Sequence, residues 1–237
     1  MEAKQDTDPA VEILKLLFAW KSREPILTIE SLRIERGERV FIIGPSGSGK
    51  TTLLSIVAGV VIPQQGTVAV NSCHLNALSS AARDRFRADN IGFIYQMFNL
   101  IPYLSVVENI TLPCRFSERR RNRCIATSSD VKNDALRLLR HLGMDDKKMV
   151  GKPVTELSVG QQQRVAAARA LIGAPEIIIA DEPTSSLDHN RREDFIRLLF
   201  NECDRENTTI IFVSHDTSLE KLFDRTIRLN EINDVQS

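Results

Sequence analysis

The stretch Gly44–Thr52, which reads GPSGSGKTT, decides the fold class of this chain. Its first eight residues match the pattern G-x-x-x-x-G-K-[ST], whose glycines let backbone N–H groups turn inward around phosphate oxygens. In this pattern the lysine reaches the β- and γ-phosphates and the hydroxyl after it binds Mg²⁺. The apolar run Val40–Ile43 precedes the loop and a periodic apolar segment begins at Leu53, so the order is strand, tight loop, helix. We expect the nucleotide phosphates to contact Gly44, Pro45, Ser46, Gly47, Ser48, Gly49, Lys50, Thr51 and Thr52.

Two further buried runs end in polar residues. Glu176–Ala180 is followed by Asp181 and Glu182, and Thr208–Val213 is followed shortly by His215. In parallel α/β sheets, ligands bind at the carboxyl ends of the strands. We therefore expect Asp181 to hold Mg²⁺ through water, and Glu182, facing the other way, to polarise the water that attacks the γ-phosphate.

The rest of the chain predicts a sheet with a helical region inserted into it. Val11–Trp20 and Ile26–Ile34 are strand-like stretches that would open a sheet. From about residue 97 to residue 173 the character is mainly helical, with a capping box formed by Ser105 and Glu108 and a later run of apolar residues at helical spacing. We interpret this region as a helical subdomain.

Composition excludes several classes of protein. The 237 residues carry 31 Lys and Arg against 31 Asp and Glu, so no whole-chain field attracts nucleic acid, and we expect no nucleic-acid partner. The most apolar stretch, Leu53–Ile62, is ten residues long, whereas a membrane span needs about 20. The first ten residues are polar and net acidic, unlike a signal peptide, which predicts a cytoplasmic location.

The cysteines and one basic run carry weaker signals. The cysteines lack metal-ligand spacing, and we expect them to be reduced and structural. The run 118–123, ERRRNR, favours a solvated loop over a contact with a partner or with lipid headgroups. The four cysteines are Cys73, Cys114, Cys124 and Cys203.

A second glycine-containing stretch, Leu157–Arg164, reads LSVGQQQR. Ser158 can cap the helix that follows it, Gln161 completes an S-x-x-Q box, and Gly160 keeps the helix N-terminus open as a second anion site. The stretch resembles the LSGGQ signature of ATP-binding cassette (ABC) ATPases, with Val159 in place of the first glycine. This resemblance implies a head-to-tail homodimer in which each signature closes over the ATP bound to the opposite subunit.

The same resemblance assigns roles to other residues. Gln96 resembles the glutamine-loop residue that senses Mg²⁺ and leads into the surface contacting a membrane subunit. His215 resembles the switch histidine at the γ-phosphate, and Asp188 the D-loop residue that reaches across the dimer. Trp20 is our candidate for stacking on adenine, with Phe18 as the alternative. The residues so expected are Glu182, His215 and Gln96 for catalysis, Thr51, Gln96 and Asp181 for Mg²⁺, and Trp20, Ser158, Gly160, Gln161 and Asp188 with the phosphate loop for ATP.

The fold implied by the resemblance is that of a P-loop NTPase of the ABC type. It has a mostly parallel α/β sheet core, an N-terminal antiparallel β-subdomain and the helical insert, in one nucleotide-binding domain over residues 11–237 after a polar tail of residues 1–10.

The segment Phe93–Pro113 resembles the branch of lipoprotein-release, macrolide-export and FtsE-type ATPases. We therefore expect the ATP-hydrolysing subunit of a bacterial ABC transporter, peripheral on the inner face of the cell membrane and powering a separate permease. The alternative is a regulatory ATPase scaffold that controls a cell-envelope or division complex without moving solute. A cassette acting on ribosomes or DNA is less favoured, because such proteins usually carry two cassettes or a long coiled coil.

Overall fold

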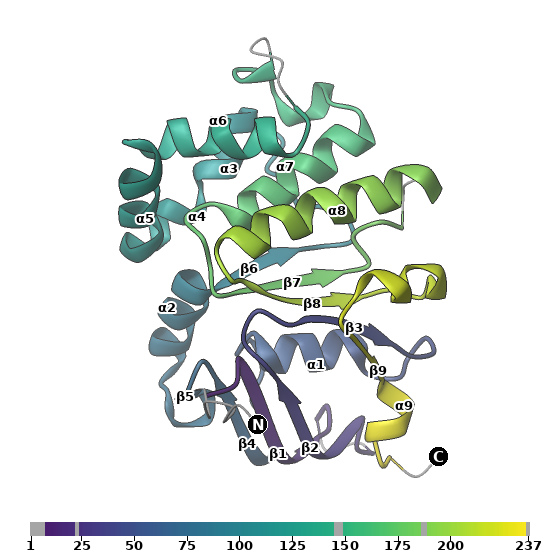
Figure 1. Ribbon diagram of the computed structural model, residues 1–237. Helices are drawn as coiled ribbons and strands as arrows, with labels where there is room; N and C mark the ends of the chain where they lie inside the picture. Colours follow the sequence, from purple (N-terminus) through teal and green to yellow (C-terminus); the bar gives the residue numbers. More distant parts are fainter. Residues whose placement is uncertain (1–7, 22–23, 145–148, 186–188, 236–237) are drawn as a thin grey trace, which may run out of the picture.

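The computed structural model describes residues 8–21, 24–144, 149–185 and 189–235. Its centre is a five-stranded sheet in which every paired neighbour is parallel, in the order β6-β7-β8-β3-β9 (Figure 1). The predicted mostly parallel core is therefore confirmed. The strands are β3 (Arg39–Ile43), β6 (Ile91–Ile94), β7 (Ile177–Asp181), β8 (Thr209–Val213) and β9 (Arg225–Arg228).

Helices cover both faces of this sheet, which explains why its strands read as continuous apolar runs. In β7, Ile178 faces the core shared with α7 (Val159–Leu171) and α8 (His189–Arg205). Ile177 and Ile179 face the opposite core, which contains α1 (Lys50–Val57). Figure 1 shows α7 and α8 on one side of the sheet and α1 on the other.

A second sheet of four strands lies beyond α1, in the order β2-β1-β4-β5, and all of its pairings are antiparallel (Figure 1). Because α1 lies between the two sheets, all the apolar residues of its last turns are buried, among them Leu53 and Leu54. The predicted antiparallel β-subdomain is thus confirmed, and it also recruits two strands from after the phosphate loop. The strands are β1 (Val11–Phe18), β2 (Leu27–Ile34), β4 (Gln65–Val70) and β5 (Cys73–His74).

The described elements between residues 97 and 173 are all helical. The capping box predicted at Ser105 and Glu108 opens the first of them, and Asp130 caps the amphipathic helix that follows. These helices are α3 (Val106–Thr111), α4 (Pro113–Phe116), α5 (Glu118–Ser128), α6 (Val131–His141), η3 (Val154–Glu156) and α7. The remaining helices are η1 (Leu75–Ala77), α2 (Ser80–Asn90), η4 (Thr217–Leu222) and α9 (Leu229–Ile232).

The basic run 118–123 is not a solvated loop, and that expectation is wrong. It forms the first turns of α5, and Arg120 is only 2% exposed. Its guanidinium donates to the backbone oxygens of Ala170 and Ile172, at the C-terminal end of α7. The last carbonyls of a helix have no partner within the helix, so Arg120 supplies donors that α7 lacks. Burial lowers the pKa of Arg120 to about 10.

All four cysteines lie in the described part of the chain and are free thiols. Within the described ranges, no helix combines the length and the apolar character that a bilayer crossing requires.

Candidate functional site

The predicted polar residues meet at the carboxyl edge of the parallel sheet. Side chains alternate along β7, so Asp181 lies on the same face of the strand as Ile177 and Ile179. The helix α1 covers this face, and Asp181 therefore lies beside the first turn of α1. The Thr51 hydroxyl donates to Asp181 Oδ2 at 3.2 Å. One residue on, the Glu182 amide donates to the Val213 carbonyl at 3.0 Å, which fixes the tip of β7 against the tip of β8. The phosphate loop and both acidic residues therefore lie together.

The phosphate loop is held open by two glycines with left-handed backbone, Gly47 at φ 81° and Gly49 at φ 98°. Gly49 is the residue that caps α1, and a Cβ there would lie 2.8 Å from a methyl group of Leu27. Only glycine adopts this conformation without strain and fits beside β2. The buried Ser48 hydroxyl makes no hydrogen bond within the described residues. The loop thus keeps an unused donor close to the helix N-terminus.

Lys50 folds back over its own loop. Its ammonium donates to the backbone oxygens of Gly44 at 2.7 Å and Pro45 at 2.8 Å. Both acceptors of the Lys50 ammonium are carbonyl oxygens, which carry only a partial negative charge. A fully charged group can therefore replace them. A phosphate group in the loop offers Lys50 a full negative charge instead.

Thr51 and Asp181 form a pair of oxygen donors that suits Mg²⁺. This ion prefers hard oxygen ligands and keeps several waters, so one hydroxyl and one carboxylate beside a phosphate loop fit it. Burial raises the pKa of Asp181 above its ordinary value, and the neighbouring charge of Glu182 adds to the rise, whereas the Thr51 hydrogen bond and Lys50 oppose it. A divalent cation would favour the ionised carboxylate that burial disfavours.

Glu182 and His215 form a second polar pair at this edge. His215 Nδ1 lies 2.9 Å from Glu182 Oε2, and the carboxylate side chain is 15% exposed while the imidazole is 73% exposed. Glu182 has φ 48°, an uncommon conformation for a residue with a side chain, and such strain concentrates at functional positions. The arrangement holds a carboxylate next to the phosphate loop and fixes its direction through the imidazole.

Gln96 and Trp20 each follow a strand by two residues. Gln96 lies in the turn directly after β6, whose last residue, Ile94, pairs with Ala180 of β7. Trp20 follows β1 and is 45% exposed, whereas its alternative, Phe18, is 4% exposed and packs edge-on against it at 5.0 Å. The exposed ring is therefore Trp20.

The signature stretch forms the start of α7. Ser158 caps the helix and exchanges hydrogen bonds with Gln161, so the predicted capping box is present. Ser158, Gly160 and Gln161 line a hollow that shares no residue with the hollow lined by Gly44, Pro45 and His215. The signature residues and the phosphate-loop residues therefore line two different hollows. Asp188 lies outside the described residues.

Two glutamines that support the site were not predicted. Gln163 is buried in α7 and donates to the Pro183 carbonyl at 2.8 Å, tying the signature helix to the residue after Glu182. Gln64 accepts a hydrogen bond from the Ala19 amide at 3.0 Å and donates to the Ala19 carbonyl at 2.7 Å, which fixes the backbone before Trp20. The only signal for Gln163 was its place in a run of three glutamines, and Gln64 gave none.

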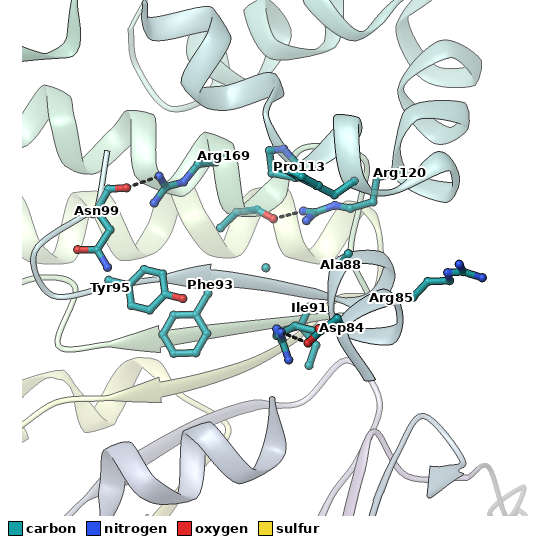
Figure 2. Close-up of a pocket in the computed structure, with 14 residues that line it drawn as sticks. Asp84, Arg85, Ala88, Ile91, Phe93, Tyr95, Asn99, Pro113, Arg120 and Arg169 are labelled. Carbon is teal, nitrogen blue, oxygen red and sulfur yellow. Dashed lines mark hydrogen bonds and ion pairs between the residues drawn. The ribbon is translucent and has the colours of Figure 1, made fainter. Parts of the chain in front are cut away.

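A separate groove of about 560 Å³ lies beside the edge strand β6, between α2 and the helices α4, α5 and α7 (Figure 2). Its wall includes the stacked rings of Phe93 and Tyr95, whose centroids are 4.2 Å apart. Arg169 holds the next turn of chain by donating to the backbone oxygens of Phe98 and Asn99. Gln96 lies between Tyr95 and Phe98 in the same segment of chain. This segment therefore connects the groove with the carboxyl edge of the parallel sheet, which we call the nucleotide edge.

Comparison with known proteins agrees with this geometry. The sequence profile described as "ABC transporter" matches residues 27–185, about two thirds of the chain. The chain belongs to the ABC transporter family. Proteins of this family with the same cassette are ATPases, and this chain is an ABC ATPase with the ATP-binding subunit's fold.

Several relatives are similar over most of their length. The chain is 39% identical to the lipoprotein-releasing system ATP-binding protein LolD of Bacteroides thetaiotaomicron, over 84% of this chain and 87% of that protein. It is 40% identical to the ABC transporter ATP-binding protein YbbA of Escherichia coli, over 86% of each.

A solved structure of the ABC ATPase MJ0796 of Methanocaldococcus jannaschii, dimeric and bound to ADP and phosphate, has a TM-score of 0.76 and 34% identity, covering 92% of this chain and 93% of that one.

Proposed function

We propose that this chain is the ATP-hydrolysing subunit of a LolD-like ABC transporter that powers a separate membrane permease through ATP-driven closure of a homodimer. The observation that carries the proposal is the split arrangement of the site. Thr51, Asp181, Glu182 and His215 gather at the phosphate loop, whereas Ser158 lies in a different hollow. The phosphate-loop cluster lacks a signature helix, and the signature stretch lacks a phosphate loop. In this proposal a second copy of the chain supplies the missing part of each site.

In this proposal the phosphate loop and the aromatic residue before β2 hold ATP. Backbone amides of the loop and the Lys50 ammonium bind the phosphates, and the exposed ring of Trp20 stacks on adenine. Thr51, Gln96 and Asp181 hold Mg²⁺, which would neutralise charge on the phosphates when bound. The residues of the loop in this role are Gly44, Pro45, Ser46, Gly47, Ser48, Gly49, Lys50, Thr51 and Thr52.

Glu182 is the proposed base of the hydrolytic reaction. Its carboxylate accepts a hydrogen bond from the attacking water, and His215, at 2.9 Å, keeps the carboxylate directed at the γ-phosphate. In this proposal Gln96, in the turn after β6, completes the water site.

The second copy closes the site from outside. Ser158, Gly160 and Gln161 would present the N-terminus of α7 to the γ-phosphate of the opposite subunit, and Asp188 would reach across the interface. The dimeric state of MJ0796 supports this arrangement. Val159, 49% exposed at this helix end, adds an apolar side chain to the closing surface.

We further propose that the groove beside β6 receives a short amphipathic segment of the permease on the inner face of the membrane. Its rim carries the exposed apolar side chains Tyr95 and Phe116, and Met97 extends it, while arginines supply charge. Aromatic and Met side chains flanked by Arg are typical of protein interfaces.

In this proposal residues 1–10 form a polar tail and residues 11–237 form one ATP-binding domain.

The replacement Glu182→Gln tests the hydrolytic part of the proposal. We expect ATP turnover to fall by about 10²- to 10⁴-fold, since a positioned base contributes that much, and the variant to accumulate as an ATP-bound dimer. Turnover by steady-state phosphate release and mass by multi-angle light scattering measure the two effects. Glu30→Gln, on the exposed side of β2, is the matched control. Wild-type turnover in Glu182→Gln would remove Glu182 from this role.

A further inference from the structure

A pair of thiols lies in the helical region, away from the nucleotide site. Cys114 belongs to α4 and Cys124 to α5, and their Sγ atoms are 3.7 Å apart. A disulfide bond is about 2.0 Å long, so the two sulfurs need to approach by about 1.7 Å. Small rotations of two short side chains cover such a distance. All four cysteines are described, and no sulfur–sulfur contact involves Cys73 or Cys203.

The short helix α4 controls access to this pair. Cys114 is 5% exposed and Cys124 fully buried, so the oxidant must be small or α4 must open. The helix has four residues, and its neighbour Ser117 already has an extended backbone. A single helical turn is marginally stable by itself, so local opening of α4 costs less than unfolding of the core. Phe116, at the end of α4, is 72% exposed.

The surroundings of the two thiols shift their pKa values in opposite directions. A hydrogen bond from Cys124 lowers the pKa of Cys114 and the nearby Arg120 guanidinium acts in the same direction, while burial opposes both. For Cys124, the same hydrogen bond and burial raise the pKa. The thiolate is the reactive form of cysteine, and Cys114 is also the less buried of the two residues, so a peroxide reaches Cys114 first.

We propose that Cys114 and Cys124 are an oxidation site, which forms a reversible disulfide when the protein meets a peroxide. The Cys114 sulfur attacks one peroxide oxygen, the O–O bond breaks, and a sulfenic acid and one water result. The Cys124 sulfur then attacks the Cys114 sulfur and displaces the hydroxyl group as a second water. Two thiols are oxidised and one hydrogen peroxide is reduced to two waters. A thiol reductant reverses the bond.

The bond would fasten α4 to α5 at the edge of the groove. Pro113 and Phe116 flank Cys114 and line the groove, and so does Arg120, one helical turn before Cys124. Closing a ring over residues 114–124 removes the opening motion of α4. The inference concerns a modification of this chain and does not depend on the proposed transport function.

Peroxide titration of the purified chain tests the proposal. After oxidation and alkylation under denaturing conditions, we expect the free-thiol count to fall from four to two, with a loss of two hydrogen atoms in the intact mass. Peptide mapping should place the link between Cys114 and Cys124, and dithiothreitol should restore four thiols. Amide hydrogen exchange of α4 should slow in the oxidised protein.

Two variants separate the steps. Cys124→Ser should stop at the sulfenic acid of Cys114, which dimedone captures. Cys203→Ser is the matched control, because Cys203 is also buried but lies against no other thiol. In this variant the disulfide between Cys114 and Cys124 should form as in the unchanged protein. A peroxide-treated sample that keeps four thiols, links Cys73, or carries a sulfinic acid on Cys114 without a link overturns the proposal. The wild-type map decides the matter if the serine variants fail to fold.

Discussion

Asp181 carries an energetic cost that its neighbours only partly remove. Burial and the charge of Glu182 raise the pKa of its carboxyl, and Thr51 and Lys50 lower it by less. The folded-state pKa is therefore above the unfolded-state value, so ionisation of Asp181 destabilises the nucleotide-free fold. This penalty is complete above the folded-state pKa and disappears as pH falls below the unfolded-state value, about 4.

We expect Asp181→Asn to raise the melting temperature of the nucleotide-free protein near pH 7. The neutral amide keeps an acceptor for Thr51 and lacks the buried charge, and a gain of ~1 kcal/mol corresponds to about 2–4 °C in a chain of this size. Thermal melts from pH 7 down toward about 4 should show the difference shrinking, because the wild-type carboxyl becomes protonated. A difference of the same size at both ends of this range would contradict the argument, and Glu30→Gln should melt like the wild type.

At the scale of elements, a side chain of α5 connects this helix to the end of α7. The guanidinium of Arg120 replaces the missing donors for two backbone carbonyls, and Arg119 and Arg123 form ion pairs with Glu176, at the start of the next strand. The run of basic residues therefore fastens the helical region to the sheet.

We expect Arg120→Met to reduce the free energy of unfolding by about 2–4 kcal/mol, because each orphaned buried carbonyl costs about 1–3 kcal/mol. Arg120→Lys should cost less, since an ammonium can still reach one carbonyl. The neighbour Arg121 is the control, because its side chain is 50% exposed and pairs only at 3.3 Å with Glu118 among the described contacts. Arg121→Met should change stability by at most about 1 kcal/mol in urea unfolding. Equal effects at the two positions would refute the role of Arg120.

The predictable elements were those whose signals are local. Val40–Ile43, the phosphate loop and the cap at Ser158 each follow from a few consecutive residues, because a buried parallel strand, a tight turn and a helix start need only their own sequence. Arg120 meets its carbonyl partners 50 and 52 residues away, and Gln64 meets Ala19 across 45 residues. Charge alone favoured a solvated loop at 118–123, since nothing local indicates which backbone groups will lack partners.

At the scale of the whole molecule, the groove beside β6 and the nucleotide edge are joined by the short segment from Phe93 to Asn99. Gln96 lies in the middle of this segment, and Arg169 holds its C-terminal end by donating to the backbone oxygens of Phe98 and Asn99. A partner bound in the groove therefore contacts the same piece of chain that borders the site of hydrolysis.

If the proposed permease docks in the groove, we expect Phe116→Asp to reduce its recovery with this chain by tenfold or more, since a charge buried in an apolar contact costs about 2 kcal/mol or above. Co-purification from membranes of cells that express both proteins measures the effect. Val60→Asp, at a 58% exposed apolar position outside the groove lining, should leave recovery unchanged. Equal recovery for Phe116→Asp and Val60→Asp would exclude the groove as the docking site.

The helix α7 is held at three points along its length. Ser158 caps its start, the side chain of Gln163 is bonded near its first turns to Pro183, and Arg120 grips its end. Its 13 residues make a strut of about 20 Å, and a helix of that length bends little under thermal forces. A displacement along the helix axis at one end would therefore reach the other end undiminished. The signature and the groove are joined by one short, stiff helix, which is also bonded to the residue that follows the proposed base.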